Sequence, residues 1–118
     1  AEQLAAAGGL RHLDLQGNHI KCQGVIALAA AFQVNGGLTT VNLRGNEVAD
    51  SGATALGKAL MHNKSVTELH LGANRIGAEG AVQIAGSQAH GGRLTVLDVA
   101  ANAILDAGAA SIAQLLRR

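Results

Sequence analysis

Residues 10–20 read LRHLDLQGNHI, and the same pattern returns as LTTVNLRGNEV at 38–48, VTELHLGANRI at 66–76 and LTVLDVAANAI at 94–104. Each stretch begins 28 residues after the previous one, so the apolar positions and one asparagine recur in register. A fixed period of this length is typical of a solenoid, in which each unit buries its apolar face against its neighbours. The chain of 118 residues is therefore expected to form one continuous array.

Each unit has a strand signal followed by a helix signal. The L-x-L core alternates apolar and polar residues, as a half-buried strand does. The following stretches, such as GVIALAAAF at 24–32 and GATALGKAL at 52–60, carry apolar residues at helical spacing. Because a helix is about 10 Å wide and strands lie about 4.8 Å apart, the stack is expected to curve with the strands on its inner side.

The four stretches resemble the leucine-rich repeat consensus L-x-x-L-x-L-x-x-N-x-L. The 28-residue period, with a Gly- and Ala-rich helix after the asparagine, is similar to the ribonuclease-inhibitor-like subfamily. The resemblance covers residues 10–118 and implies an α/β solenoid, an open curved horseshoe with parallel strands on the concave face and helices on the convex face. The expected units are a helix tail of an incomplete repeat at 1–9, then repeats at 10–37, 38–65, 66–93 and 94–118. The last is incomplete, and neither end has a capping segment, so we expect a fragment of a longer protein.

The recurring asparagines are Asn18, Asn46, Asn74 and Asn102. They stand where each strand turns into its loop, and we expect their amides to bond backbone groups and so to support the fold rather than an activity. Asp50 and Asp106 each precede a small residue and a glycine, which predicts that they cap the helices of their own repeats.

The resemblance places the third, fifth and seventh residues of each repeat on the concave face. Same-column side chains then lie about 4.8 Å apart, one strand from the next. We expect Asn42, His70 and Asp98 to be lateral neighbours, and a functional interpretation makes His70 and Asp98 a charge pair or a pH-sensitive contact. The candidate protein-binding residues are His12, Asp14, Gln16, Asn42, Arg44, Glu68, His70 and Asp98.

Composition and spacing exclude several kinds of site. Nine Lys and Arg against eight Asp and Glu leave a charge of +1, too balanced for a nucleic-acid partner. One aromatic residue and one cysteine remove stacking platforms and multi-cysteine zinc sites, and no apolar run is long enough for a membrane span. A metal site at His12, Asp14, Glu68 and His70 fails because the two pairs lie two strands apart, about 10 Å. No catalytic residue, metal, cofactor or small-molecule substrate is predicted.

The predicted function is a non-enzymatic protein-interaction scaffold in the cytoplasm, and we favour a structural subunit of a cytoskeletal, ciliary or axonemal assembly. Two alternatives stay open on the resemblance: the ligand-sensing arm of a NOD-like receptor, and a GTPase activator of the Ran type, for which Asn42 and Arg44 are the residues to test. Ribonuclease inhibition is less favoured, because those inhibitors are cysteine-rich in alternate repeats where this chain has asparagine.

Overall fold

The computed structural model describes residues 11–34, 36–89, 93–100 and 102. The predicted helix tail at 1–9, the helix of the fourth repeat and the cap at Asp106 lie outside these residues. Within them, strands and helices alternate in chain order: β1 (His12–Asp14), α2 (Cys22–Val34), β2 (Thr40–Asn42), α3 (Ala49–His62), β3 (Glu68–His70), α4 (Ala78–Ala89) and β4 (Val96–Asp98).

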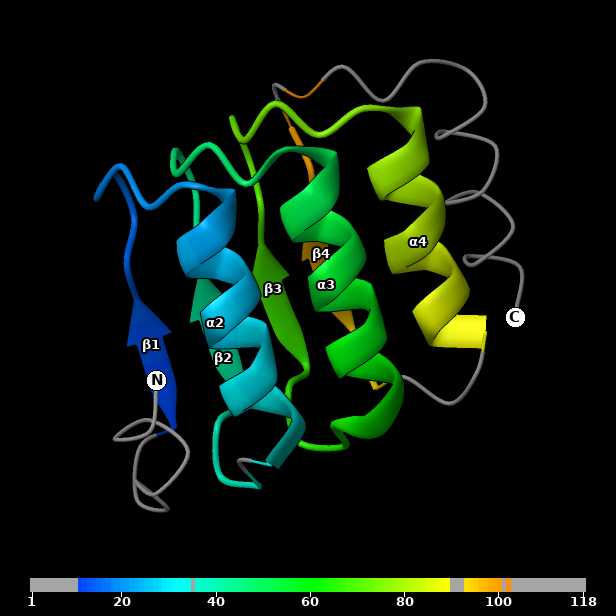
Figure 1. The fold of residues 1–118 in the computed structure, drawn as a ribbon. Coiled ribbons are helices and arrows are strands. Elements are labelled where there is room, and N and C mark those ends of the chain that lie inside the picture. The colour runs from blue at the N-terminus through cyan, green and yellow to red at the C-terminus, as the bar shows by residue number, and fades with distance from the viewer. Residues whose placement is uncertain (1–10, 35, 90–92, 101, 103–118) are drawn as a thin grey trace.

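The four strands form one parallel sheet in the order β1-β2-β3-β4, and the three helices lie side by side along one of its faces (Figure 1). The strand register pairs Leu13 with Val41, Val41 with Leu69 and Leu69 with Leu97. These partners are 28 residues apart, so the sequence period is the repeat of the structure. The predicted α/β solenoid, with parallel strands on one side and helices on the other, is confirmed.

The core lies between the sheet and the helices. Val41 and Leu69, on the two central strands, are almost fully buried, and Leu56 of α3 and Ile84 of α4 pack into the same cluster. Leu13 and Leu97, on the outer strands, are only partly buried. Each repeat therefore buries its apolar residues against its neighbours, as expected for a solenoid.

Small residues let neighbouring helices approach closely. A Cβ atom at Gly57 of α3 would lie 2.8 Å from the carbonyl oxygen of Gln83 in α4. The loops that follow the strands also need unusual backbone: Gly45 has a φ of +72°, and Ala73, in the same column, has a φ of +53°. Because L-residues other than glycine avoid this left-handed region, Ala73 is held there by the bonds around it.

The prediction that Asp50 caps its own helix is wrong. The residue before α3 is Val48, and it makes no side-chain cap hydrogen bond. Asp50 lies inside the first turn of α3 and points to the next repeat, where its Oδ1 accepts hydrogen bonds from the backbone N–H groups of Gly77 (2.7 Å) and Gly80 (3.0 Å). The carboxylate thus caps α4, whose own first residue is an alanine.

Gln88 replaces an apolar residue in the third repeat, and the structure gives it a bonding role. Its side chain is buried near the end of α4, and its Oε1 accepts a hydrogen bond from the backbone N–H of Leu94 at 2.9 Å. In the previous repeat Asn63 Oδ1 accepts from the N–H of Val66 at 2.8 Å, at the same point before the strand. An amide therefore closes the helix-to-strand turn in both repeats, although the two amides stand at different positions.

Candidate binding face on the sheet

The side of the sheet turned away from the helices, here called the open face, carries the alternate side chains of all four strands. Its rows follow from the register: His12, Thr40, Glu68 and Val96 form one row, and Asp14, Asn42, His70 and Asp98 form the next. Gln16, Arg44, Gly72 and Ala100 follow two residues later in each repeat.

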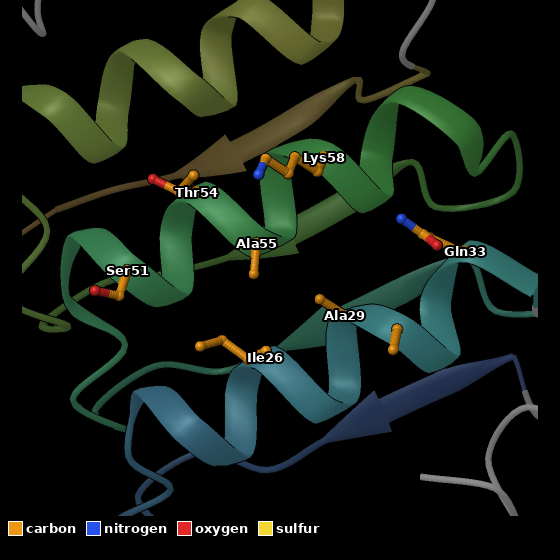
Figure 2. A pocket seen from close by; sticks show the side chains of 8 residues that line it. Ile26, Ala29, Gln33, Ser51, Thr54, Ala55 and Lys58 are labelled. Carbon is orange, nitrogen blue, oxygen red and sulfur yellow. The ribbon is translucent and has the colours of Figure 1, made fainter.

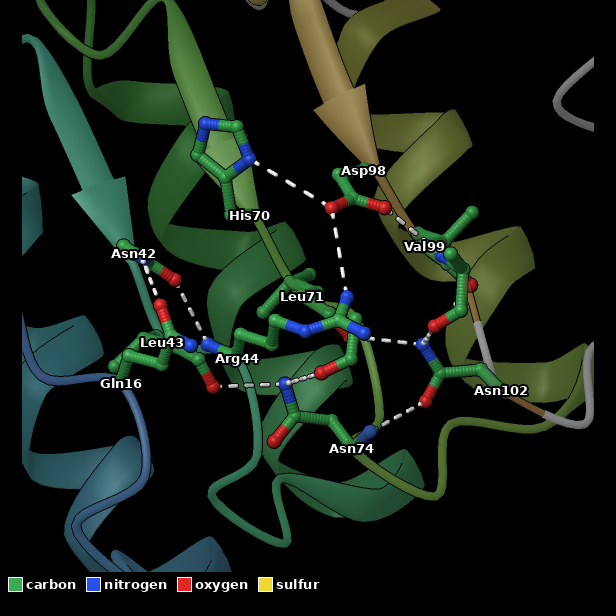
Figure 3. Close-up of polar contacts among 12 residues, drawn as sticks. Gln16, Asn42, Leu43, Arg44, His70, Leu71, Asn74, Asp98, Val99 and Asn102 are labelled. Carbon is green, nitrogen blue, oxygen red and sulfur yellow. Dashed lines mark hydrogen bonds and ion pairs between the residues drawn. The ribbon is translucent and has the colours of Figure 1, made fainter.

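A chain of polar contacts runs across the open face from β1 to β4 (Figure 3). Asn42 Nδ2 donates to Gln16 Oε1 at 3.0 Å, and Asn42 Oδ1 accepts from the backbone N–H of Arg44 at 3.1 Å. The guanidinium of Arg44 then reaches over β3, where its Nη1 lies 3.8 Å from Asp98 Oδ2. These contacts join groups from three of the four repeats.

Gly72 makes the reach of Arg44 possible. A Cβ atom at position 72 would overlap the guanidinium of Arg44, which covers this buried glycine. Gly72 stands in the column of Gln16 and Arg44 and presents no side chain there. The sequence signal was a glycine in a column of long polar side chains, but the pattern alone could not show that a residue of the neighbouring strand fills the space.

His70 is the exception in its row. Asp14, Asn42 and Asp98 each accept a hydrogen bond through Oδ1 from the backbone N–H two residues ahead, at 3.0, 3.1 and 3.0 Å. The ring of His70 instead faces two carboxylates, with Nε2 3.1 Å from Glu68 Oε2 and Nδ1 3.8 Å from Asp98 Oδ2. The structure therefore brings Arg44, Glu68, His70 and Asp98 together, whereas His12 and Asp14 lie on β1 away from this group.

The recurring asparagines join one repeat to the next. Asn46 Oδ1 accepts from the backbone N–H groups of Asn18 (2.9 Å) and Ile20 (3.1 Å), and its Nδ2 donates to the carbonyl oxygens of Leu15 and Leu43. Asn74 and Asn102 each accept the two corresponding backbone N–H groups one and two repeats later, and their Nδ2 groups donate to the carbonyl oxygens of Leu43 and Leu71 (Figure 3). Asn18 differs because its side chain is exposed, and among the described residues its Nδ2 donates to the carbonyl oxygen of Gln16 at 3.4 Å.

The helical side carries an open pocket between α2 and α3 (Figure 2). Its volume is about 380 Å³, its floor is mostly alanine, and polar groups of Gln33, Ser51, Thr54 and Lys58 stand at its margin. The pocket arises from the small side chains that face each other there, and no pattern in the sequence indicates it. In the described residues, no group of three or more His, Cys, Asp or Glu is placed to hold a metal ion. No helix among those residues has the length and apolar character needed to cross a membrane.

Comparison with known proteins gives one family and one fold. A family model described as "Leucine Rich repeat" matches residues 10–29, 38–57, 62–85 and 94–113. Among the solved structures, the chain is similar to "Leiomodin-1 Actin-Binding Site 2 (ABS2)", with a TM-score of 0.88 and 21% sequence identity over 98% of this chain and 69% of that chain. At 21% sequence identity, this similarity shows that the two chains share a fold. No curated protein matches the sequence.

Proposed function

Because this chain belongs to the leucine-rich repeat family, we propose that it is a non-enzymatic scaffold whose protein partner docks on the open face of the sheet. The observation that supports this most is that each of the four strands presents a polar side chain in one row of this surface, namely Asp14, Asn42, His70 and Asp98. Protein interfaces carry polar and charged groups around a more apolar centre, and complementary charges across an interface give specificity.

The arrangement of these side chains favours recognition over chemistry. Asn42 and Gln16 bond each other, and Arg44, His70, Glu68 and Asp98 form one group of charged and ionisable side chains. These side chains contact one another on a surface that a partner can reach. The candidate residues His12, Asp14, Gln16, Asn42, Arg44, Glu68, His70 and Asp98 are proposed as the binding surface, and Asn18, Asn46, Asn74 and Asn102 as its structural support.

We also propose that the partner belongs to the cytoskeleton, and that the chain forms part of a cytoskeletal, ciliary or axonemal assembly in the cytoplasm. The likeness in fold to an actin-binding site of leiomodin-1 supports a cytoskeletal partner. The 28-residue register of the strands supports the ribonuclease-inhibitor-like subfamily and repeats at 10–37, 38–65, 66–93 and 94–118.

Site-specific photo-crosslinking tests the proposed surface. A photo-crosslinking amino acid is placed at Thr40 on the open face, and in a matched variant at Lys58 on the helical side. We expect Thr40 to capture a protein partner from cells of the source organism and Lys58 to capture less of it, with the captured protein identified by mass spectrometry. Capture from Lys58 alone, or from neither position, would refute docking on the open face.

Co-sedimentation tests the cytoskeletal partner. The chain is spun with filamentous actin and separately with microtubules, and the fraction in each pellet is measured against a no-polymer control. We expect one of the two polymers to carry the chain into the pellet. If the chain stays in the supernatant with both polymers and Thr40 captures a protein unrelated to either, the cytoskeletal assignment is rejected. The scaffold proposal is then still supported.

A further inference from the structure

One part of the open face combines charge with exposed apolar surface. We call it the β3–β4 seat and define it by Glu68, His70, Val96 and Asp98. Glu68 lies opposite Val96 and His70 lies opposite Asp98 in the strand register. Val96 is 42% exposed, and the other exposed large hydrophobic side chains of the described residues all lie on helices. The seat therefore has one exposed apolar side chain, Val96, and two carboxylates, both of which face the ring of His70.

The open face is acidic although the chain is not. In the described ranges, three of the six acidic residues lie on this face, namely Asp14, Glu68 and Asp98, whereas Arg44 is the one basic residue there among seven. The whole chain carries a formal charge of +1, so the face has the opposite sign to the rest of the molecule. A surface of this sign attracts cationic groups and repels carboxylates.

We propose that the β3–β4 seat binds a lysine or arginine side chain of the partner protein. The aliphatic stem of such a side chain would lie on Val96, and its charged end would reach Glu68 and Asp98, because lysine and arginine bury their stems on apolar surface while the charge stays in contact with polar groups. The inference rests on the proposed docking to the open face and names the chemistry of the partner.

The contacts of the Asp98 carboxylate support a cationic occupant. Its Oδ1 accepts from the backbone N–H of Ala100, which fixes the carboxylate, while its Oδ2 lies 3.8 Å from both Arg44 and His70. Strong charge-assisted bonds are shorter, about 2.7–2.9 Å. Oδ2 is therefore held beside two groups that bind it only loosely, and a cation from a partner can approach it more closely than Arg44 does.

Arg44 then acts as a competitor within the chain. Its guanidinium lies beside the oxygen of Asp98 that the partner's cation would use, and its side chain is 41% exposed, so water can solvate the guanidinium when a partner displaces it. Removing the charge of Arg44 should tighten the binding of a cationic partner. If instead the partner were acidic, Arg44 would be its anchor, and the same change would weaken binding. The sign of this effect distinguishes the two partner chemistries.

Fluorescence anisotropy with the full chain tests the proposal. The probes are two labelled eight-residue peptides, one alternating lysine with glycine and one alternating glutamate with glycine, at low salt so that exposed charges are not screened. We expect the lysine peptide to bind, Glu68→Gln and Asp98→Asn each to weaken it roughly three-fold, and Arg44→Gln to tighten it. The matched control is Glu79→Gln on α4, which removes the same charge away from the seat and should leave the affinity unchanged.

Three results would overturn the inference: no binding of the lysine peptide, equal weakening by the control variant, or weaker binding after the change at Arg44. Circular dichroism of each variant checks that the fold is kept. The outcome is separate from that of the crosslinking experiment. If the partner captured at Thr40 binds Glu68→Gln and Asp98→Asn as tightly as the parent, the seat is rejected and the scaffold proposal stands. If the lysine peptide binds but no protein is captured, the seat stands and docking of a protein partner on the open face is rejected.

Discussion

Replacing Asn74 with alanine should cost far more stability than the same change at Asn18, although the two residues share a column of the repeat. Asn74 is fully buried. Its Oδ1 accepts from the backbone N–H groups of Asn46 (2.7 Å) and Val48 (3.4 Å), and its Nδ2 donates to the carbonyl oxygens of Leu43 (2.8 Å) and Gly72 (3.1 Å). The alanine variant loses all four bonds.

The two carbonyl oxygens keep other partners, because Leu43 also accepts from Asn46 Nδ2 and Gly72 accepts from the N–H of Gly45. The two N–H groups have no second acceptor among the described residues. An unpaired buried donor costs about 1–3 kcal/mol, and the 3.4 Å bond belongs at the lower end of that range. The expected loss is therefore about 3 kcal/mol, a large part of the roughly 5–15 kcal/mol that stabilises a typical domain.

Urea unfolding followed by circular dichroism measures the effect. With a slope of about 1–3 kcal/mol per molar, typical of small proteins, the midpoint of Asn74→Ala should fall by roughly 1–3 M. Asn18→Ala should stay within about 0.5 kcal/mol of the parent, because its side chain is exposed and makes one long bond among the described residues. Equal losses in the two variants would refute the reasoning, since they would mean that the asparagine contributes through something other than these buried bonds.

Three further predictions concern single groups, each measured by the same unfolding experiment. Asp50→Ala should cost about 1–2 kcal/mol and expose the amides at the start of α4 to faster hydrogen exchange, because the lost carboxylate caps that helix; unchanged exchange there would contradict the assignment. Gly57→Ala should destabilise the protein by about 1–3 kcal/mol, because the added Cβ would meet the backbone of α4. Gly86→Ala has open space around it and should stabilise the protein by roughly 0.5–1 kcal/mol. Effects of the same sign in the two variants would contradict the helix packing described. Ala73→Gly should stabilise by about 0.5–1 kcal/mol by relieving a φ of +53°, and a loss of stability would show that the left-handed backbone carries no strain.

The fold could be predicted from the sequence because its determinants recur. The L-x-L cores around Leu13, Val41, Leu69 and Leu97 fix both the strands and the register, since a shift by one residue would turn every apolar side chain to the open face. The row containing His70 and Asp98 follows from the same spacing. These inferences use only the period of the chain and the pleat of a strand.

The parts that escaped prediction depend on single side chains that break the repeat. Cys22 and Ala78 carry no carboxylate in the column of Asp50, and Asp106, which does, indicated a cap on its own helix rather than a bond to the next one. Arg44 has several rotatable bonds, and its direction is set by the empty space over Gly72. Such contacts are decided by packing in three dimensions, and spacing in the sequence carries no information about them.

The asparagine contacts also bear on how such an array could have grown. Each amide completes the loop of the preceding unit, with partners 26 to 31 residues away along the chain. A segment of that length copied in tandem therefore carries the asparagine amide that bonds the preceding unit and the backbone groups that bond the amide of the following unit. Any two copies of this length can form the same junction. The Asp50 contact is different, because Cys22, which stands in the same column one repeat earlier, has no carboxylate to make it. Gene duplication could thus have multiplied the units at once, while the individual contacts that distinguish one junction from another had to arise afterwards, by point mutation.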